Sequence, residues 1–228
     1  MTAEIAVRGR AGAARIRGRV LAGFERGGSM RLEGLAPFGA PVFILVARAN
    51  RATLWLPRDR QVLRDAAVED VLGTIAGLPR TADDLLALLS GCLVDAPGPV
   101  TAGSSSPNGW SMVELQDRTR AYLRRDGDAW RIVAGQHDGS GGEGAWSVTY
   151  DGFAPTFPGT IGFRQQAGTN SDPGPASTLT LETSQVETNV PVDPAAFDVA
   201  VPADAQPLTL DDLHRSDPMR DRDAGGSR

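Results

Sequence analysis

The sequence offers two histidines, His137 and His214, for acid–base chemistry or metal binding. His137 is followed by Asp138, a pair that in a hydrolase would work with a serine or a bound water. The sequence contains no GxSxG motif, and two histidines make a poor metal site unless carboxylates complete it. We therefore expect no catalytic residue and no metal site. A hydrolase that uses His137 and Asp138 stays open as an alternative.

Two other motifs suggest chemistry but have structural explanations. Gly139 to Gly144 matches GxGxxG, which binds a dinucleotide only where the glycines open a helix. Here they lead into Trp146-Ser-Val-Thr-Tyr150, which alternates like a strand, so we expect a plain loop and no cofactor. Asp83 and Asp84 resemble an acid–base pair, but acidic residues at a helix start are explained by the helix dipole.

The distribution of charge and the number of cysteines exclude some classes of function. Residues 1–65 hold 12 Arg and 5 Asp plus Glu, a balance of +7, within a chain of net charge -5, so residues 66–228 carry -12. Basic N-terminal strands can favour anionic headgroups, although a solvated face is the ordinary explanation of scattered surface charge. A pI near 5.1 opposes nucleic-acid binding. The single cysteine, Cys92, excludes a disulfide framework within the chain, and its leucine neighbours predict a buried thiol.

Hydropathy predicts a soluble chain. Pro41 to Ala47 is the most apolar run and falls short of the roughly 18 to 20 residues that a membrane span needs. The first residues lack the basic and apolar regions of a secretory signal, so any export signal has been removed or never existed.

Most of the chain shows the two-residue period of β-strands. Arg15 to Glu25 alternates basic with apolar residues, Arg26-Gly-Gly28 predicts a turn, and Met30 to Leu35 returns. Val42 to Ala49 and Leu54 to Leu56 are apolar on both faces and need cover on both. The later strands are expected at 111–115, 119–124, 129–134, 145–150, 160–165 and 177–187.

Two helices interrupt the strands. Asp65 is a plausible N-cap for a helix over Ala66 to Ala76, which Leu78-Pro79 ends. Thr81 and Asp84 approximate a capping box for a second, leucine-rich helix that ends near Gly91. We expect loops or a flap at 96–109, a hairpin turn at 126–128, and loops at 137–144 and 166–176.

These elements predict a mainly β (α+β) fold, in which a curved antiparallel sheet forms an incomplete β-barrel with a two-helix lid. One domain is expected over residues 1–202, with the lid near 66–91. Residues 203–228 are polar and are expected to form a disordered tail.

The remaining candidate site is apolar, because the mouths of β-barrels are recurrent ligand sites. The residues predicted to line this apolar cavity are Ile44, Val46, Leu54, Leu56, Leu72, Ile75, Leu85, Leu86, Leu89, Trp130 and Trp146. An ordinary core remains the default explanation for each of these residues taken singly. Phe38 differs from them, because a phenylalanine between Pro37 and Gly39 at a turn is hard for its neighbours to cover.

The order of these motifs resembles the LolA/LolB group of bacterial lipoprotein-sorting proteins, and more closely the outer-membrane receptor LolB. The similarity extends over about residues 3–202. It rests on Arg31-Leu-Glu-Gly-Leu-Ala-Pro-Phe-Gly39, Gly77-Leu-Pro79, Trp146-Ser-Val-Thr-Tyr-Asp-Gly-Phe153 and Leu179-Thr-Leu181.

The resemblance implies a non-enzymatic protein of the bacterial periplasm and leaves open an association with the outer membrane. It would bind and transfer the acyl chains of lipoproteins or other lipid in an apolar cavity, without a cofactor. Its partners would be acyl chains, the outer-membrane surface and a periplasmic carrier protein. By the same resemblance, Pro37, Phe38 and Gly39 would form a membrane-insertion loop. An envelope domain that binds or senses a protein partner on the same barrel is the open alternative, and it predicts a cavity filled by the protein's own side chains.

Overall fold

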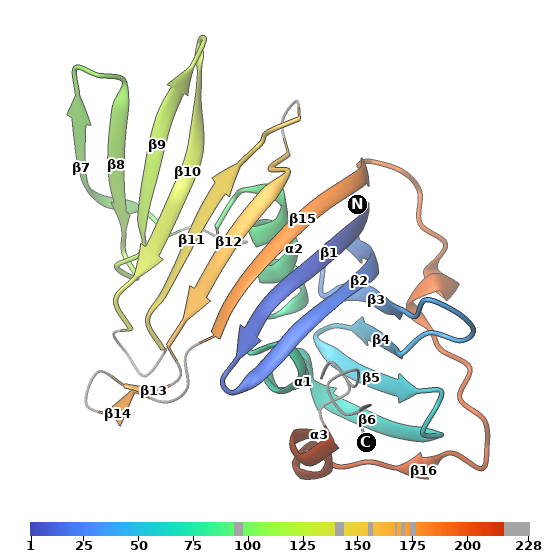
Figure 1. Cartoon of the computed structure of the whole chain (residues 1–228). Coiled ribbons are helices and arrows are strands. Elements are labelled where there is room, and N and C mark those ends of the chain that lie inside the picture. Colours follow the sequence, from blue (N-terminus) through green and yellow to red (C-terminus); the bar gives the residue numbers. More distant parts are fainter. Residues whose placement is uncertain are drawn as a thin grey trace, which may run out of the picture.

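The fold is one large open β-sheet with a pair of helices against one face (Figure 1). A computed structural model describes residues 1–93, 98–139, 144–154, 157–166, 168–169, 172–173 and 177–216. The sheet has 14 strands in the order β16-β6-β5-β4-β3-β2-β1-β15-β12-β11-β10-β9-β8-β7, and β13 and β14 pair separately. All pairs in it are antiparallel except β16 with β6. The predicted fold class is confirmed.

The strands form two meanders. The first runs from β1 outward to β6, α1 and α2 then connect to β7 at the opposite edge, and the second meander runs back inward until β15 pairs with β1. The first six are β1 (Thr2–Ala11), β2 (Ala14–Glu25), β3 (Ser29–Leu35), β4 (Phe43–Arg48), β5 (Arg51–Leu56) and β6 (Gln61–Ala67). The next four are β7 (Val100–Ser106), β8 (Trp110–Leu115), β9 (Arg120–Asp126) and β10 (Ala129–His137). The last six are β11 (Trp146–Asp151), β12 (Thr160–Gln165), β13 (Gly168–Thr169), β14 (Asp172–Pro173), β15 (Ser177–Glu187) and β16 (Gln206–Pro207).

The helices begin and end close to the predicted positions. They are α1 (Val68–Ala76) and α2 (Ala82–Ser90), and their C-terminal Gly77 and Gly91 are both left-handed. The predicted N-cap at Thr81 is confirmed, because the Thr81 hydroxyl accepts from the Asp84 amide at 3.1 Å and donates to the Asp84 carboxylate at 2.8 Å. The expected Asp65 cap is wrong. Asp65 lies in β6, where its ion pair with Arg51 lowers its pKa, and α1 starts after Ala67 without a side-chain cap.

The chain folds beyond the predicted boundary at residue 202. A segment that we call the strap, residues 188–205, carries the short 3-10 helix η2 (Pro194–Phe197) across the outside of β3 and β4. The strap leads to β16 and to α3 (Leu210–Ser216), which packs on α1. Leu208 and Leu213 are buried in the core, so two apolar anchors order a segment whose composition is polar. The expected tail over 203–228 therefore starts too early, and its residues 217–228 lie outside the described part.

The loop predicted at 96–109 is also partly wrong, because β7 occupies its centre. All seven side chains of β7 are exposed, so backbone pairing with β8 holds the strand without any apolar period. β7 to β10 continue the sheet beyond the two helices (Figure 1). The four residues 94–97, which contain the start of that loop, lie outside the described residues.

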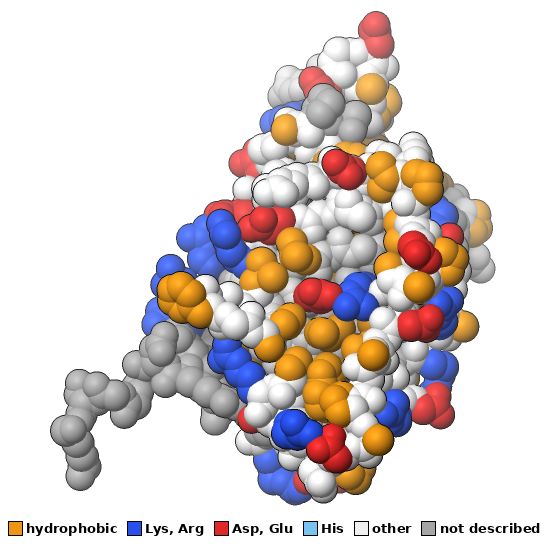
Figure 2. All heavy atoms as spheres, turned by 90° about the vertical axis from the view of Figure 1, so that its right-hand side faces the viewer, with side chains coloured by type: hydrophobic (Ala, Val, Ile, Leu, Met, Phe, Trp, Pro, Cys, Tyr) orange, Lys and Arg blue, Asp and Glu red, His pale blue; other side chains and the backbone are white. Residues whose placement is uncertain are grey.

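One core joins the sheet to the helices. Alternate residues of β1 to β6, β11, β12 and β15 pack with α1 and α2, and Leu54, Val71 and Phe163 are fully buried there. Figure 2 views the molecule from the right-hand side of Figure 1. On this face hydrophobic side chains gather between acidic and basic side chains. No helix in the described ranges is long and apolar enough to cross a membrane.

Candidate functional site

The space predicted as a ligand cavity is filled by side chains of the protein itself. Residues from the sheet and from both helices meet there in a single cluster, each with at most 5 % of its surface exposed: Leu54, Leu56, Leu72, Ile75, Leu85, Leu89 and Trp146. The sequence therefore identified the side chains that meet between sheet and lid. In this structure they form the core, and a ligand could enter there only if α2 or its neighbours moved.

Two predicted cavity residues lie on the opposite face of the sheet. Leu45 faces the helices, and Ile44 and Val46 on either side of it must face away because side chains alternate along a strand. Val46 is buried there beside β5, near the strap, whose Phe197 is only 2 % exposed. These residues form a second, smaller apolar layer under the strap and do not line the space below the lid.

The apolar face of the sheet continues past the helices onto β8, β9 and β10. Val113 is paired with Ala121, which is paired with Gly135 of β10, and the next row joins Leu123 to Ile132. Trp130 follows on the same face, opposite Arg125, with 49 % of its surface exposed. We call Val113, Leu123, Trp130 and Ile132 the apolar shelf. Apart from Trp130, these side chains are half-buried and pack against the edge of the core.

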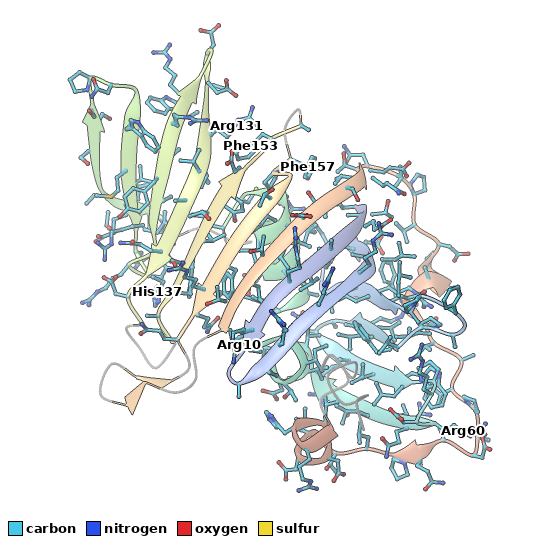
Figure 3. The ribbon with its side chains drawn as sticks, viewed as in Figure 1. Arg10, Arg60, Arg131, His137, Phe153 and Phe157 are labelled. Carbon is cyan, nitrogen blue, oxygen red and sulfur yellow. The ribbon has the colours of Figure 1, made fainter. Side chains whose placement is uncertain are left out.

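The shelf begins where the chain leaves α2. A Cβ on Gly135 would lie 2.4 Å from the Leu93 side chain, so Leu93 covers β10 at this glycine. Leu86 of α2 is likewise only partly buried against the core. The Arg131 guanidinium lies 4.4 Å from the ring centre of Phe153, which follows β11, and Figure 3 shows the two side by side. This contact ties β10 to the segment that follows β11.

The connection between the helices is held against the sheet by aromatic rings. The Arg80 guanidinium lies 4.7 Å from the Trp146 ring and 5.6 Å from the Phe163 ring. Tyr150, four residues further along β11 on the same face as Trp146, is 5 % exposed, and burial raises the pKa of its hydroxyl. These contacts fix the turn that joins α1 to α2.

The predicted exposed turn is present between β3 and β4. Phe38 is 91 % exposed, Pro37 and Gly39 are exposed beside it, and the turn lies at the right-hand edge in Figure 1. Gly39 has φ of 81°, a conformation that favours glycine. Phe38 thus presents a whole aromatic side chain to the surroundings.

His137 has a structural environment. Its Nε2 lies 2.9 Å from the Asp117 carbonyl oxygen, its Nδ1 accepts from the Gly139 amide at 3.1 Å, and its ring stacks on Trp146. Both ring nitrogens are thus used by the backbone, and Asp138 pairs with Arg120 instead. This arrangement does not favour the hydrolase alternative. His214 lies on α3, 3.3 Å from the Thr74 hydroxyl.

The other chemical candidates have structural roles, with one correction. Asp83 accepts a hydrogen bond from the Gly27 amide at 3.1 Å, and both Asp83 and Asp84 lie in the first turn of α2. The glycine motif lies mostly outside the described residues, and β11 follows it as expected. Cys92 is exposed, so the prediction of a buried thiol is wrong: the left-handed Gly91 turns the chain and Leu93 takes the buried position. The described part of the chain contains no group of three potential metal ligands.

Sequence comparisons give no match to a family model or to a curated protein. Solved structures with a similar arrangement include a LolA superfamily protein from Nitrosomonas europaea, with a TM-score of 0.48, 12 % identity and 80 % and 83 % of the two chains covered. A putative outer membrane lipoprotein-sorting protein domain from Vibrio parahaemolyticus has a TM-score of 0.49 and 13 % identity, with 86 % of this chain and 87 % of that chain covered. An uncharacterized conserved protein from Thermus thermophilus has a TM-score of 0.37 and 14 % identity, with 91 % of this chain and 90 % of that chain covered. These are similarities of overall shape at low identity.

Proposed function

We propose that this protein binds acyl chains of lipids or lipoproteins on the apolar shelf and passes them on without covalent chemistry. The observation that supports this most is the continuation of the helix-facing apolar surface beyond α2, where Trp130 and its neighbours lack the cover that the core has. Exposed apolar surface of this kind marks sites where proteins bind ligands, membranes or other proteins. The proposal agrees with the motif resemblance found in the sequence.

The shelf supplies useful affinity without a deep cavity. Each methylene removed from water contributes about 0.8 kcal/mol, so about six methylenes contribute roughly 5 kcal/mol before the cost of ordering the chain. A longer chain needs the space now filled by Leu85 and Leu89 of α2. Because α1 lies between the sheet and α3, α2 is the helix that we expect to move.

Phe38 gives the proposed transfer a contact with a membrane. An exposed phenylalanine at the tip of a turn enters an apolar interface at low cost, since its ring is already free of protein neighbours. In this proposal the protein works in the bacterial periplasm, next to the outer membrane. Transfer has one simple requirement, that cargo moves from the shelf to an equally apolar destination.

A second function is favoured by a specific observation, the packed interior between sheet and helices. A domain that recognises a protein partner on this fold needs no cavity, and the exposed β7 edge and the shelf offer surface for such a partner. The two functions differ in what the purified protein carries.

Native mass spectrometry of freshly purified full-length protein separates them. Lipid binding predicts adducts with masses of phospholipid or acylated peptide, released by detergent. A spectrum of the bare chain alone, together with no binding of an added fluorescent fatty acid, would contradict lipid binding and support the protein-partner function.

A further inference from the structure

The turn end of the β1–β2 hairpin carries four arginines on the outer face of the sheet, away from the helices. Arg8 stands directly opposite Arg17, and Arg10 directly opposite Arg15. The four side chains surround an open hollow of about 630 Å³, together with Gly9, Ile16 and Thr178. Figure 3 labels Arg10 at this end of the hairpin.

A fifth arginine extends the group across the sheet. Thr178 of β15 is paired with Arg10 on one side and with Arg164 of β12 on the other. Paired residues share a face, so a single row runs from Arg164 through Thr178 and Arg10 to Arg15. All four side chains of this row are exposed.

Most of this positive charge is not neutralised within the described residues. Arg8 forms an ion pair with Glu182, and Arg10 donates only to the Ala13 carbonyl oxygen at 3.2 Å. The side chains of Arg15, Arg17 and Arg164 form neither a hydrogen bond nor an ion pair within the described part of the chain. Like charges directly opposite one another in a sheet are destabilising, so an anion in the hollow would relieve a cost that the fold otherwise bears.

We propose that this hollow binds a phosphate group. Guanidinium groups donate two parallel hydrogen bonds to phosphate oxygens, and a tetrahedral phosphate can accept from several arginines at once. The Thr178 hydroxyl adds a donor in the middle of the row. The same phosphate chemistry is available from a soluble phosphorylated compound or from a phospholipid headgroup. The site lies on the face opposite the apolar shelf and does not depend on the lipid proposal.

Calorimetric titration of the full chain with inorganic pyrophosphate tests the site. The double variant Arg10→Gln/Arg15→Gln removes charge-assisted donors, and the dissociation constant should rise on the order of 100-fold. The control variant Arg118→Gln/Arg124→Gln makes the same change of charge at exposed positions elsewhere and should bind within about two-fold of the wild type. Equal losses in both variants, or no binding by the wild type, would overturn the proposal.

Thermal unfolding gives a second readout that detects misfolding. The site variant should be at least as stable as the wild type without ligand, because one like-charge pair is gone, and pyrophosphate should no longer raise its melting temperature. A site variant that pyrophosphate still stabilises as much as it stabilises the wild type would contradict the assignment.

Vesicle flotation identifies the source of the phosphate. Vesicles of phosphatidylglycerol and phosphatidylcholine should bind the wild type and release the site variant if the ligand is a headgroup, at about five-fold loss per arginine. Pyrophosphate binding without vesicle binding assigns the hollow to a soluble phosphate compound. Absence of pyrophosphate binding refutes the phosphate site whether or not acyl chains bind the shelf.

Discussion

Two tryptophans on the same ribbon of strands provide a matched test of the apolar shelf. Trp130 is 49 % exposed and lies opposite Arg125, while Trp110 is 45 % exposed and lies opposite Arg124. Adjacent residues of β9 point to opposite faces, so Trp130 faces the shelf side and Trp110 faces away. Trp130→Ala and Trp110→Ala therefore remove the same side chain at similar exposure from opposite faces.

The expected loss follows from the area that an acyl chain would cover. A tryptophan buries up to about 250 Å², so covering the exposed half of Trp130 removes about 100 Å² from water. At about 25 cal/mol per Å² this corresponds to roughly 2 to 3 kcal/mol, or about 30- to 150-fold in affinity.

Titration with a fluorescent fatty acid measures the loss, and urea unfolding of each variant reports stability. Trp130→Ala should weaken binding by this factor, and Trp110→Ala should bind within about two-fold of the wild type. Equal affinities of the two variants would refute the assignment of the site to the shelf.

Three further predictions use other parts of the structure. Phe38→Glu should leave stability within about 0.5 kcal/mol, because the side chain is 91 % exposed, yet abolish transfer of bound lipid to liposomes; unchanged transfer would remove Phe38 from the mechanism. Thr81→Ala should lower the free energy of unfolding by about 1 kcal/mol in urea titrations, and no loss would mean that the cap at α2 is not needed. Burial raises the pKa of Tyr150 above that of tyrosine in the unfolded chain, which is about 10. The protonated hydroxyl therefore makes its full contribution to the free energy of unfolding below about pH 10. Above that pH the contribution falls by about 1.4 kcal/mol per pH unit until the folded pKa is reached. Urea titrations from pH 8 to 11 should show this loss in the wild type and in Tyr122→Phe but not in Tyr150→Phe; a similar loss in all three would contradict it.

Local signals in the sequence predicted much of the fold. Alternation located β2 and β11, and the Thr81 box with Gly91 located both ends of α2. Segments held by distant partners were not predictable in this way. β7 depends on backbone pairing with β8, and α3 depends on the burial of Leu213 against a distant helix.

The candidate site was predictable only in part, because its position also depends on contacts between segments that are distant in the sequence. Strands that are apolar on both faces do not reveal which face meets the helices. Ile44 and Val46 were therefore grouped with Leu54, although they lie on the other face of the sheet. The shelf was missed apart from Trp130. Val113, Leu123 and Ile132 lie in strands that were expected, but the sequence did not show that Leu93 crosses at Gly135 and leaves the next rows open.

Photo-crosslinking tests the central proposal most directly, because it locates a bound acyl chain on the protein. A fatty acid with a diazirine near its methyl end is irradiated with the full chain, and the modified peptides are identified by mass spectrometry. The proposal predicts adducts on residues 110–135 and on α2, reduced in Trp130→Ala and retained in Trp110→Ala. Adducts spread over the outer face of the sheet, or confined to the strap, would contradict it.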